Sequence, residues 1–336
     1  MKIEELKKFG ITETYVERLK EGGIRELYPP QELALKKGLL EGKNLVVSVP
    51  TAGGKTLIAI MAMIKKLLTE KCKVIYVVPL VALAYEKYEK FKKIFKEQKV
   101  AISVGDFDEA DPWLKDQDII VVTSEKMDSL IRHGIGWMRE IGLMVFDEIH
   151  MINDPSRGPT LEVLITRLRV SSSNSQILAL SASIKNSKEL ADWLDAELVE
   201  SDFRPVKLYE GVSFDSKVEF LEKEGYKLRE DLSLEEAIAE DTLKRRWQAF
   251  FFLSSRRNAE SLAQRLVKIS SKYLSKNEKK ELKRIAEEVL NVLEVPTKQC
   301  KKLSACIKKG VAFHHAGLLG KQKRIVEENF KKLLNI

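Results

Sequence analysis

Cysteine and histidine are scarce in this sequence, with three and four residues among 336. Cys72, Cys300 and Cys306 have neither the even number of a disulfide framework nor the close spacing of a zinc site. We therefore expect three separate, reduced thiols. The adjacent His314 and His315 have no further Cys, His or Asp residues at ligand spacing, so we do not expect them to bind a metal.

Long apolar runs are also absent. No run reaches the ~18 residues of a membrane span, and the first residues, MKIEELKKFG, lack the apolar core of a signal peptide. Hydrophobic residues make up 44% and charged residues 32%, which is typical of a globular chain. The length suits about two domains of ~150 residues. We expect a soluble, cytoplasmic protein without a membrane partner.

Acidic residues are few in the second part of the chain. The net charge of the whole sequence is +8, and residues 242–336 alone carry 23 basic and 8 acidic residues, a net charge of +15. Residues 1–203 carry −2. One interpretation is a surface that faces a polyanion, with the lysines of 268–309 giving salt-dependent attraction. The other is a solvated, lysine-rich face on a thermophilic protein.

Short apolar runs alternate with amphipathic stretches from residue 44 onward. The runs are rich in β-branched residues and nearly continuous in hydrophobicity, as buried parallel strands are. The expected strands are 44–49, 73–78, 100–104, 118–123, 143–146 and 176–181. The expected helices are 54–69, 80–97, 124–133 and 159–170. The alternation predicts an α/β fold, a parallel sheet with helices around it.

The stretch SDFRPV (201–206) is a plausible domain boundary, so we divide the chain into residues 1–203 and 204–336. Beyond it we expect strands at 208–214, 247–254 and 311–315. Helices are expected at 256–270, 276–310 (two helices) and 320–334. The second domain is therefore predicted to contain a sheet with few strands.

The stretch VPTAGGKT (49–56) ends like a phosphate-binding loop but begins with Val49 where the usual pattern has glycine. Backbone N–H groups and a helix N-terminus make such a cradle, and they need tight turns mainly at Gly53-Gly54. We expect the nucleotide-binding residues to be Pro50, Thr51, Ala52, Gly53, Gly54, Lys55 and Thr56. Lys55 would reach the phosphates and Thr56 would bind Mg²⁺. The alternative is a Gly-Gly turn before a buried helix.

Two acids follow the apolar run LMVF (143–146), namely Asp147 and Glu148 in the stretch DEIH. Adjacent acids are costly inside a sheet and natural at its carboxyl edge. We expect Asp147 to hold Mg²⁺ and Glu148 to activate the attacking water. His150 could bond to the next strand end. The alternative, an acidic turn without function, becomes weak once both motifs are considered together.

With these motifs, the chain resembles the superfamily-two helicases along nearly its whole length. YPPQ (28–31) is similar to their adenine-reading motif, which implies that Gln31 recognises the base. PLVALAYEKY (79–88) and TSEKMDSL (123–130) resemble their nucleic-acid-gripping segments, and SAS (181–183) resembles the segment that couples ATP to domain closure. FFFLSSRR (250–257) and FHHAGL (313–318) resemble parts of their second motor domain. The implied nucleic-acid or coupling residues are Pro79, Thr123, Ser181, Ser183 and His315.

Longer stretches are similar to one group, the archaeal Holliday-junction-migration (Hjm) DNA repair helicases. These stretches are 153–169, 190–206 and 313–318. The resemblance implies a RecA-like domain followed by an incomplete second RecA-like domain. It also implies ATP and Mg²⁺ as cofactors. Arg157, in the loop SRGP, is placed to touch nucleic acid or the neighbouring domain. The alternative is that it contacts neither.

The activity implied is 3′→5′ translocation on single-stranded DNA, with forked or branched DNA as substrate in the repair of stalled replication forks. We expect a monomer, with replication or repair proteins as further partners. The alternatives are an RNA helicase of the superkiller or spliceosomal type, and an ATP- and nucleic-acid-binding module without efficient turnover. The second alternative arises because the 336 residues contain no QxxGRxGR-like arginine motif. Val81 also replaces an arginine of the family's PLRALA wording.

Overall fold

In the computed structural model, which describes residues 1–105 and 111–332, seven parallel strands form one sheet. The strands are β1 (Leu45–Ser48), β2 (Lys73–Val78), β3 (Val100–Ser103), β4 (Ile119–Thr123), β5 (Ile141–Phe146), β6 (Gln176–Ser181) and β7 (Glu197–Glu200). Their order across the sheet is β3-β4-β2-β5-β6-β1-β7. Because all seven are parallel, their carboxyl ends meet at one edge.

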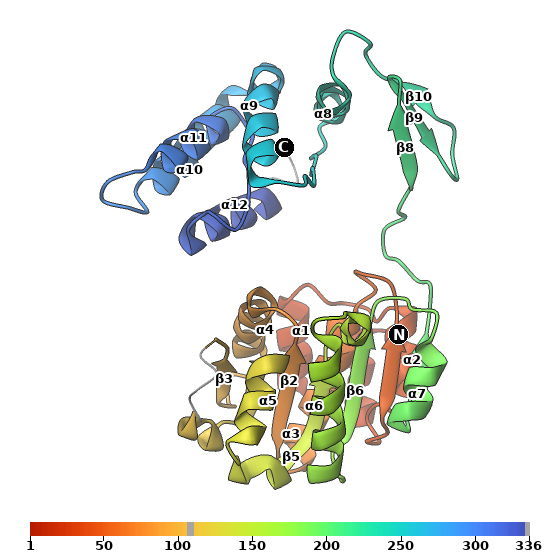
Figure 1. The fold of residues 1–336 in the computed structure, drawn as a ribbon. Coiled ribbons are helices and arrows are strands. Elements are labelled where there is room, and N and C mark those ends of the chain that lie inside the picture. Colours follow the sequence, from red (N-terminus) through yellow and green to blue (C-terminus); the bar gives the residue numbers. More distant parts are fainter. Residues whose placement is uncertain (106–110, 333–336) are drawn as a thin grey trace. The chain divides into compact units, whose positions relative to one another are not determined.

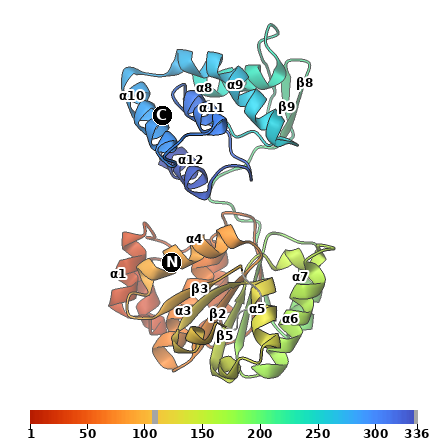
Figure 2. The ribbon, with the colours of Figure 1, turned by 60° about the vertical axis from the view of Figure 1, so that its left-hand side comes forward.

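Helices cover both faces of this sheet (Figure 1), and in Figure 2 the strands run between the two helical layers. The α-helices are α1 (Glu13–Glu21), α2 (Pro29–Lys36), α3 (Lys55–Thr69), α4 (Val81–Ile94), α5 (Ser124–Arg132), α6 (Gly158–Ser171) and α7 (Ser187–Leu194). Short 3₁₀ helices are η1 (Ile3–Phe9), η2 (Pro112–Asp116), η3 (Gly136–Glu140) and η4 (Ile149–Asn153).

Alternate side chains of each strand enter different cores, because successive residues of a strand point to opposite faces. In β2, Val74, Tyr76 and Val78 pack with residues of α1 to α4, whereas Ile75 and Val77 pack with residues of α5 to α7. Both faces are therefore buried, which explains why the strands are apolar throughout and not alternating.

The six strands and four helices expected before residue 182 are confirmed, with ends that differ by a few residues. In the same part of the chain and just after it, the elements not expected are the N-terminal helices, the short helices η2, η3 and η4, helix α7 and strand β7. Strand β7 lies at the sheet edge beside β1, and Glu197 and Glu200 give it a polar sequence that an edge strand tolerates.

The chain divides into two units, Met1–Lys207 and Leu208–Ile336, close to the boundary expected from SDFRPV. The second unit, in its described part, begins with the antiparallel strands β8 (Gly211–Phe214), β9 (Lys217–Phe220) and β10 (Tyr226–Lys227). Helices α8 (Leu234–Lys244), α9 (Arg256–Tyr273), α10 (Lys276–Leu290), α11 (Lys298–Ile307) and α12 (Gly320–Lys332) follow. The last two residues of the helix expected at 320–334 lie outside the described residues.

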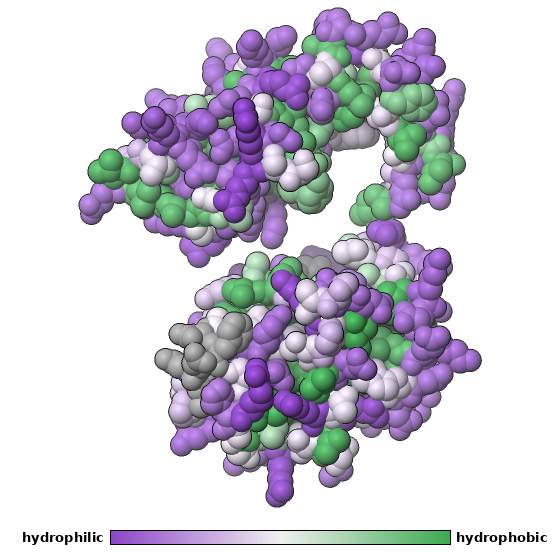
Figure 3. Space-filling view, in the orientation of Figure 1, coloured by the Kyte–Doolittle hydropathy of each residue, from purple (hydrophilic) through white to green (hydrophobic). Residues whose placement is uncertain are grey.

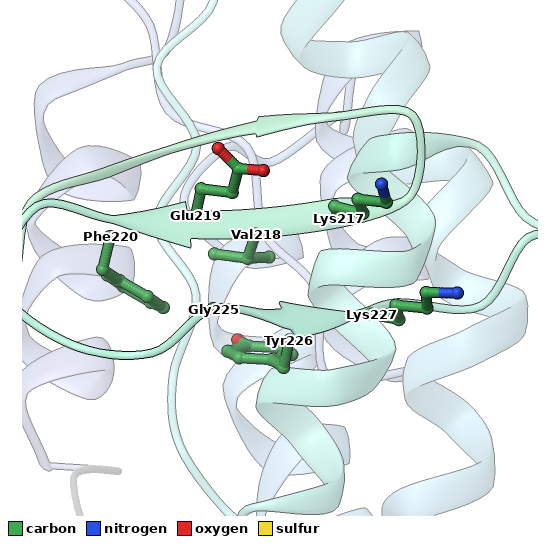
Figure 4. A pocket seen from close by; sticks show the side chains of 7 residues that line it. All are labelled: Lys217, Val218, Glu219, Phe220, Gly225, Tyr226 and Lys227. Carbon is green, nitrogen blue, oxygen red and sulfur yellow. The ribbon is translucent and has the colours of Figure 1, made fainter.

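The hairpin β8–β9 turns at Asp215 and Ser216, whose φ angles of 43° and 58° fit a type I′ turn. Figure 3 shows hydrophobic side chains at the surface of this hairpin, where Val212 and Leu221 are exposed. A shallow hollow lies between β9 and β10. Figure 4 shows lysine side chains at one end of it and aromatic rings at the other; its lining is Lys217, Val218, Glu219, Phe220, Gly225, Tyr226 and Lys227.

The strands expected at 247–254 and 311–315 are wrong: neither segment has regular secondary structure. A strand needs a neighbour that accepts and donates its backbone hydrogen bonds, and within the described residues no strand pairs with either segment. Trp247, Phe250 and Phe252 are consequently exposed, Phe252 to 91%. The high β-propensity of WQAFFFL favours a strand, but a strand also needs a neighbouring strand to pair with, and β-propensity does not provide one.

Candidate nucleotide site at the carboxyl edge of the sheet

The loop after β1 has the geometry of a phosphate cradle without a glycine at its first position. The Val49 N–H still donates to the Ser181 carbonyl oxygen at 3.2 Å, so Val49 continues the sheet and needs no special backbone conformation. Glycine is required later. A Cβ on Gly53 would lie 2.3 Å from Val49 Cγ1, and Gly54 has φ 88° with Gln31 Nε2 where its Cβ would be.

Pro50, Thr51 and Ala52 form the outer turn of this loop. The Pro50 carbonyl accepts from the Gly53 N–H at 3.0 Å, which closes the turn. Ala52 has φ 67°, an unusual value for a residue with a Cβ. Thr51 and Ala52 are exposed, so a ligand can approach the turn from solvent.

Lys55 and Gln31 hold the loop from its two ends. Lys55, the first residue of α3, is 8% exposed, and its Nζ donates to the Val49 carbonyl oxygen at 3.1 Å. Burial lowers the pKa of the Lys55 ammonium, and the Glu148 and Asp147 carboxylates oppose that effect. Gln31, at the start of α2, accepts from the Tyr28 N–H at 2.7 Å and donates to the Gly54 carbonyl oxygen at 3.1 Å. Both ends of its amide are therefore engaged.

Asp147 follows β5 and is 7% exposed. Its Oδ1 accepts from the Glu148 N–H at 3.0 Å, and its Oδ2 accepts from the Tyr76 hydroxyl at 2.8 Å. Lys87 Nζ lies 3.3 Å from the same Oδ2. Burial and the adjacent Asp147 raise the pKa of Tyr76 well above its usual value, so the hydroxyl stays a donor. The carboxylate is thus fixed in direction and compensated in charge.

Glu148 is held in the left-handed region with φ 52°. Its side chain is partly exposed, with Oε2 3.4 Å from His150 Nδ1. Among the described residues, the buried His150 Nδ1 has no hydrogen-bond partner. A left-handed backbone at a partly exposed acid is typical of functional sites.

Thr56 and Asp147 converge on one cation position. Lys87 Nζ donates to Thr56 Oγ1 at 3.1 Å while it pairs with Asp147 Oδ2 at 3.3 Å. The ammonium shows that a hydroxyl and a carboxylate oxygen from different elements can share a cation, and these oxygens are ligands that Mg²⁺ accepts. The two residues would therefore fit a magnesium ion.

Arg157 lies at the same edge and connects two of the segments expected to grip nucleic acid. Its Nη1 donates to the Pro79 carbonyl oxygen at 3.0 Å, and its Nε lies 4.0 Å from Glu125 Oε1. Thr123 caps α5 by accepting from the Lys126 N–H at 3.4 Å. Pro79 follows β2 and Thr123 ends β4, so both lie at the edge that carries the acids.

Ser181 and Ser183 differ in accessibility although they are two residues apart. Ser181 ends β6 and is fully buried, and its hydroxyl has no hydrogen-bond partner. Ser183 is exposed. An unpaired buried hydroxyl beside the loop after β1 is costly unless a further group reaches it.

His315 belongs to the second unit, where its ring stacks on Phe313 with centroids 5.5 Å apart. Its Nε2 lies 3.3 Å from Glu260 Oε1 and 3.4 Å from Gln299 Nε2, and its Nδ1 accepts from the Gly317 N–H at 3.2 Å. The ring is therefore fixed by its own unit.

Two residues of the site were missed in the sequence, Lys87 and Tyr76. Lys87 stands on the buried stripe of α4 with Ala84, Phe91 and Ile94. A lysine at an apolar position of a helical stripe is a signal that could have been recognised, because buried lysines are rare unless paired. Tyr76 carried no such signal within the apolar run KVIYVV.

The chain is similar to known helicases. Residues 28–191 match the DEAD/DEAH box helicase family. The ATP-dependent DNA helicase Hel308 of Methanocella arvoryzae is 46% identical over an alignment of 316 residues, which covers 92% of this chain and 42% of that protein. The Hel308 helicase of Pyrococcus horikoshii is 46% identical over 337 residues, covering 99% of this chain and 44% of that protein.

The chain therefore spans less than half the length of these relatives. In the described residues, none of the helices has the length and apolar character that crossing a membrane requires.

Proposed function

We propose that the chain is the ATP-binding motor portion of an ATP-dependent DNA helicase. The premise is that it contains a DEAD/DEAH box helicase domain and is homologous to the N-terminal part of the Hel308 helicases. The observation that carries the proposal is the convergence of the Gly53-Gly54 loop, Thr56 and Asp147 at one sheet edge. A loop at the N-terminus of α3 attracts phosphate, and two oxygens facing one cation position suit its counter-ion.

Each residue has a definite task in this proposal. The loop N–H groups from Gly53 onward bind the phosphates, and Lys55 exchanges the Val49 carbonyl for a phosphate oxygen. Thr56 and Asp147 hold Mg²⁺, which when bound offsets the negative charge of the phosphates. Glu148 orients the attacking water and accepts its proton, because it is the exposed acid of the pair and its carboxylate is not consumed by the Tyr76 and Lys87 contacts.

Gln31 would recognise the adenine base. In the structure its amide already joins Tyr28 to Gly54, so a base that binds Gln31 would also act on the phosphate loop. This arrangement supports the proposal that Gln31 both recognises the base and positions the phosphate loop.

DNA is the proposed polyanion because the relatives are named DNA helicases. The proposed nucleic-acid or coupling residues are Pro79, Thr123, His150, Arg157, Ser181, Ser183 and, from the second unit, His315. Movement in the 3′→5′ direction, forked DNA as substrate, fork repair, a monomeric state and a cytoplasmic location belong to the same proposal.

Equilibrium binding of Mg·ADP, followed by ATP turnover with single-stranded DNA or RNA of one sequence, tests this function. We expect Lys55→Ala to weaken Mg·ADP binding at least about a hundredfold, because charge-assisted phosphate contacts are lost. Glu148→Gln should keep binding and abolish any turnover. Unchanged binding in Lys55→Ala would refute the site.

The remaining outcomes decide between the alternatives. Stronger stimulation by RNA would replace the DNA assignment with an RNA helicase. Binding without turnover would identify these 336 residues as a nucleotide-dependent binding module. The matched control is Lys65→Ala, which removes a lysine from the same helix where its Nζ bonds the Phe9 carbonyl, away from the loop.

A further inference from the structure

Lys87 has a position that the proposed chemistry does not explain. It lies on α4, is only 7% exposed, and places its ammonium between Thr56 Oγ1 (3.1 Å) and Asp147 Oδ2 (3.3 Å). These are the two oxygens assigned to Mg²⁺. Two cations cannot share them, since neighbouring like charges in a partly buried site repel strongly.

We propose that Lys87 is a resident counter-ion of the metal position, which must give up Asp147 when Mg²⁺ arrives with a nucleotide. The inference rests on the proposed function, because it needs Thr56 and Asp147 to be the metal ligands. Lys87 keeps the Asp147 carboxylate neutralised in the absence of a ligand, and its departure exchanges one cation for another.

A place for the displaced ammonium exists. Glu86 Oε1 lies 3.8 Å from Lys87 Nζ, and its side chain is 57% exposed. A modest rotation of the lysine chain toward Glu86 moves the charge from the buried pair toward solvent. The ammonium thus leaves Asp147 without being left unpaired.

The exchange also reaches α4 as a whole. Phe91, one turn after Lys87, packs edge-on against Tyr76 with ring centroids 5.0 Å apart, and the Tyr76 hydroxyl bonds Asp147. The same helix begins at Val81, next to the exposed Leu80 and near the exposed Tyr85. Metal occupancy at Asp147 therefore acts on Lys87 directly and on Phe91 through Tyr76, and both residues belong to the helix that follows Pro79, a proposed nucleic-acid or coupling residue.

The test uses Mn²⁺, which takes the same oxygen ligands as Mg²⁺ and is detected by electron paramagnetic resonance. The full chain is titrated with Mn²⁺ in the presence of ADP. In Lys87→Met the side chain keeps most of its length but loses the competing charge. We expect the Mn²⁺ concentration at half-saturation to fall about tenfold, equivalent to about 1.4 kcal/mol. Lys93→Met, an exposed lysine of the same helix, should leave it unchanged.

A second measurement uses the unmodified protein, in case Lys87→Met folds poorly. Acetylation of lysines, read by mass spectrometry, should be slow at Lys87 with ADP and EDTA and at least about fivefold faster with ADP and Mg²⁺. Lys93 is the internal control and should react equally in both. Faster reaction of Lys87 alone supports displacement, and an equal rate contradicts it.

The two proposals fail differently. A chain that does not bind Mn·ADP, or binds it equally after Lys55→Ala, refutes the proposed function. A chain whose Mn·ADP binding depends on Lys55 but whose half-saturation is unchanged or raised in Lys87→Met refutes only the counter-ion role. A raised value would mean that Lys87 supports the bound nucleotide and does not compete with the metal.

Discussion

At the scale of single residues, Asp147 depends on neighbours that fix both of its oxygens. Oδ1 is held by the Glu148 N–H and Oδ2 by the Tyr76 hydroxyl. Partners behind a ligand set its direction and its charge, and their loss reduces metal affinity even though they never touch the metal. In the proposed site, Tyr76 would therefore be a positioning residue for Asp147.

Removal of the Tyr76 hydroxyl isolates this effect. Tyr76→Phe keeps the ring that packs on Phe91 but leaves Asp147 without a buried hydrogen bond to a charged acceptor. We expect the free energy of unfolding, measured with urea, to fall by about 2 kcal/mol. Tyr85→Phe, whose side chain is 54% exposed, should change it by less than about 0.5 kcal/mol. Equal values for the two variants would contradict the assigned role of the hydroxyl.

At the scale of elements, the sequence predicted the strands and helices whose own residues are enough to indicate their secondary structure. The runs IIVVT and QILALS are buried on both faces, so their hydrophobicity alone indicates parallel strands. The expected helices 54–69 and 124–133 likewise had a periodicity that packing on one face explains. Asp147 comes directly after β5, and Lys55 and Thr56 begin the helix that follows β1 and its loop, so the strands were enough to predict one sheet edge for all three.

Other elements depend on neighbours that the local sequence does not contain. Residues 247–254 resemble a strand, but no described strand pairs with them. Residues 197–200 resemble a loop, yet β1 beside them makes them a strand. Lys87 was missed for the same reason, because its role depends on its distances to Thr56 and Asp147 and not on its neighbours in the sequence.

Gly158, the first residue of α6, shows how closely two elements approach at the site. A Cβ at this position would lie 2.1 Å from the Ile152 carbonyl oxygen of η4, which is a backbone atom and cannot rotate away as a side chain could. Gly158→Ala should therefore lower the free energy of unfolding by about 2–3 kcal/mol in urea denaturation. Gly136→Ala, at the start of η3 where nothing lies within 4 Å, is the matched control. A small, equal loss of unfolding free energy in both variants would show that η4 moves readily to make room for the added methyl group.

At the scale of the whole molecule, the two units have separate cores. The two large hydrophobic clusters that enclose the sheet end at Val199, and the other two clusters begin at Ala239. Every residue of the candidate nucleotide site lies in Met1–Lys207. The candidate nucleotide site and the basic segment 242–336 therefore belong to different units.

A chain that stops after Lys207 tests this separation. Because its two cores and its loop are complete, we expect it to unfold cooperatively and to bind Mg·ADP with a dissociation constant within about threefold of the full chain, measured by calorimetry. The fragment with Lys55→Ala is the control and should not bind. A fragment that folds but has lost nucleotide affinity would show that residues beyond 207 contribute to the site.

The order of the strands has a consequence for synthesis on the ribosome. Among the described strands, β1, which leads into the candidate phosphate loop, pairs only with β6 and β7, and the first residue of β6 is Gln176. At a synthesis rate of roughly 5–20 residues per second, β1 waits on the order of ten seconds for its first neighbour. During that interval β2, β4 and β5 can already assemble, so the loop that holds the nucleotide is translated early but takes its place in the sheet late.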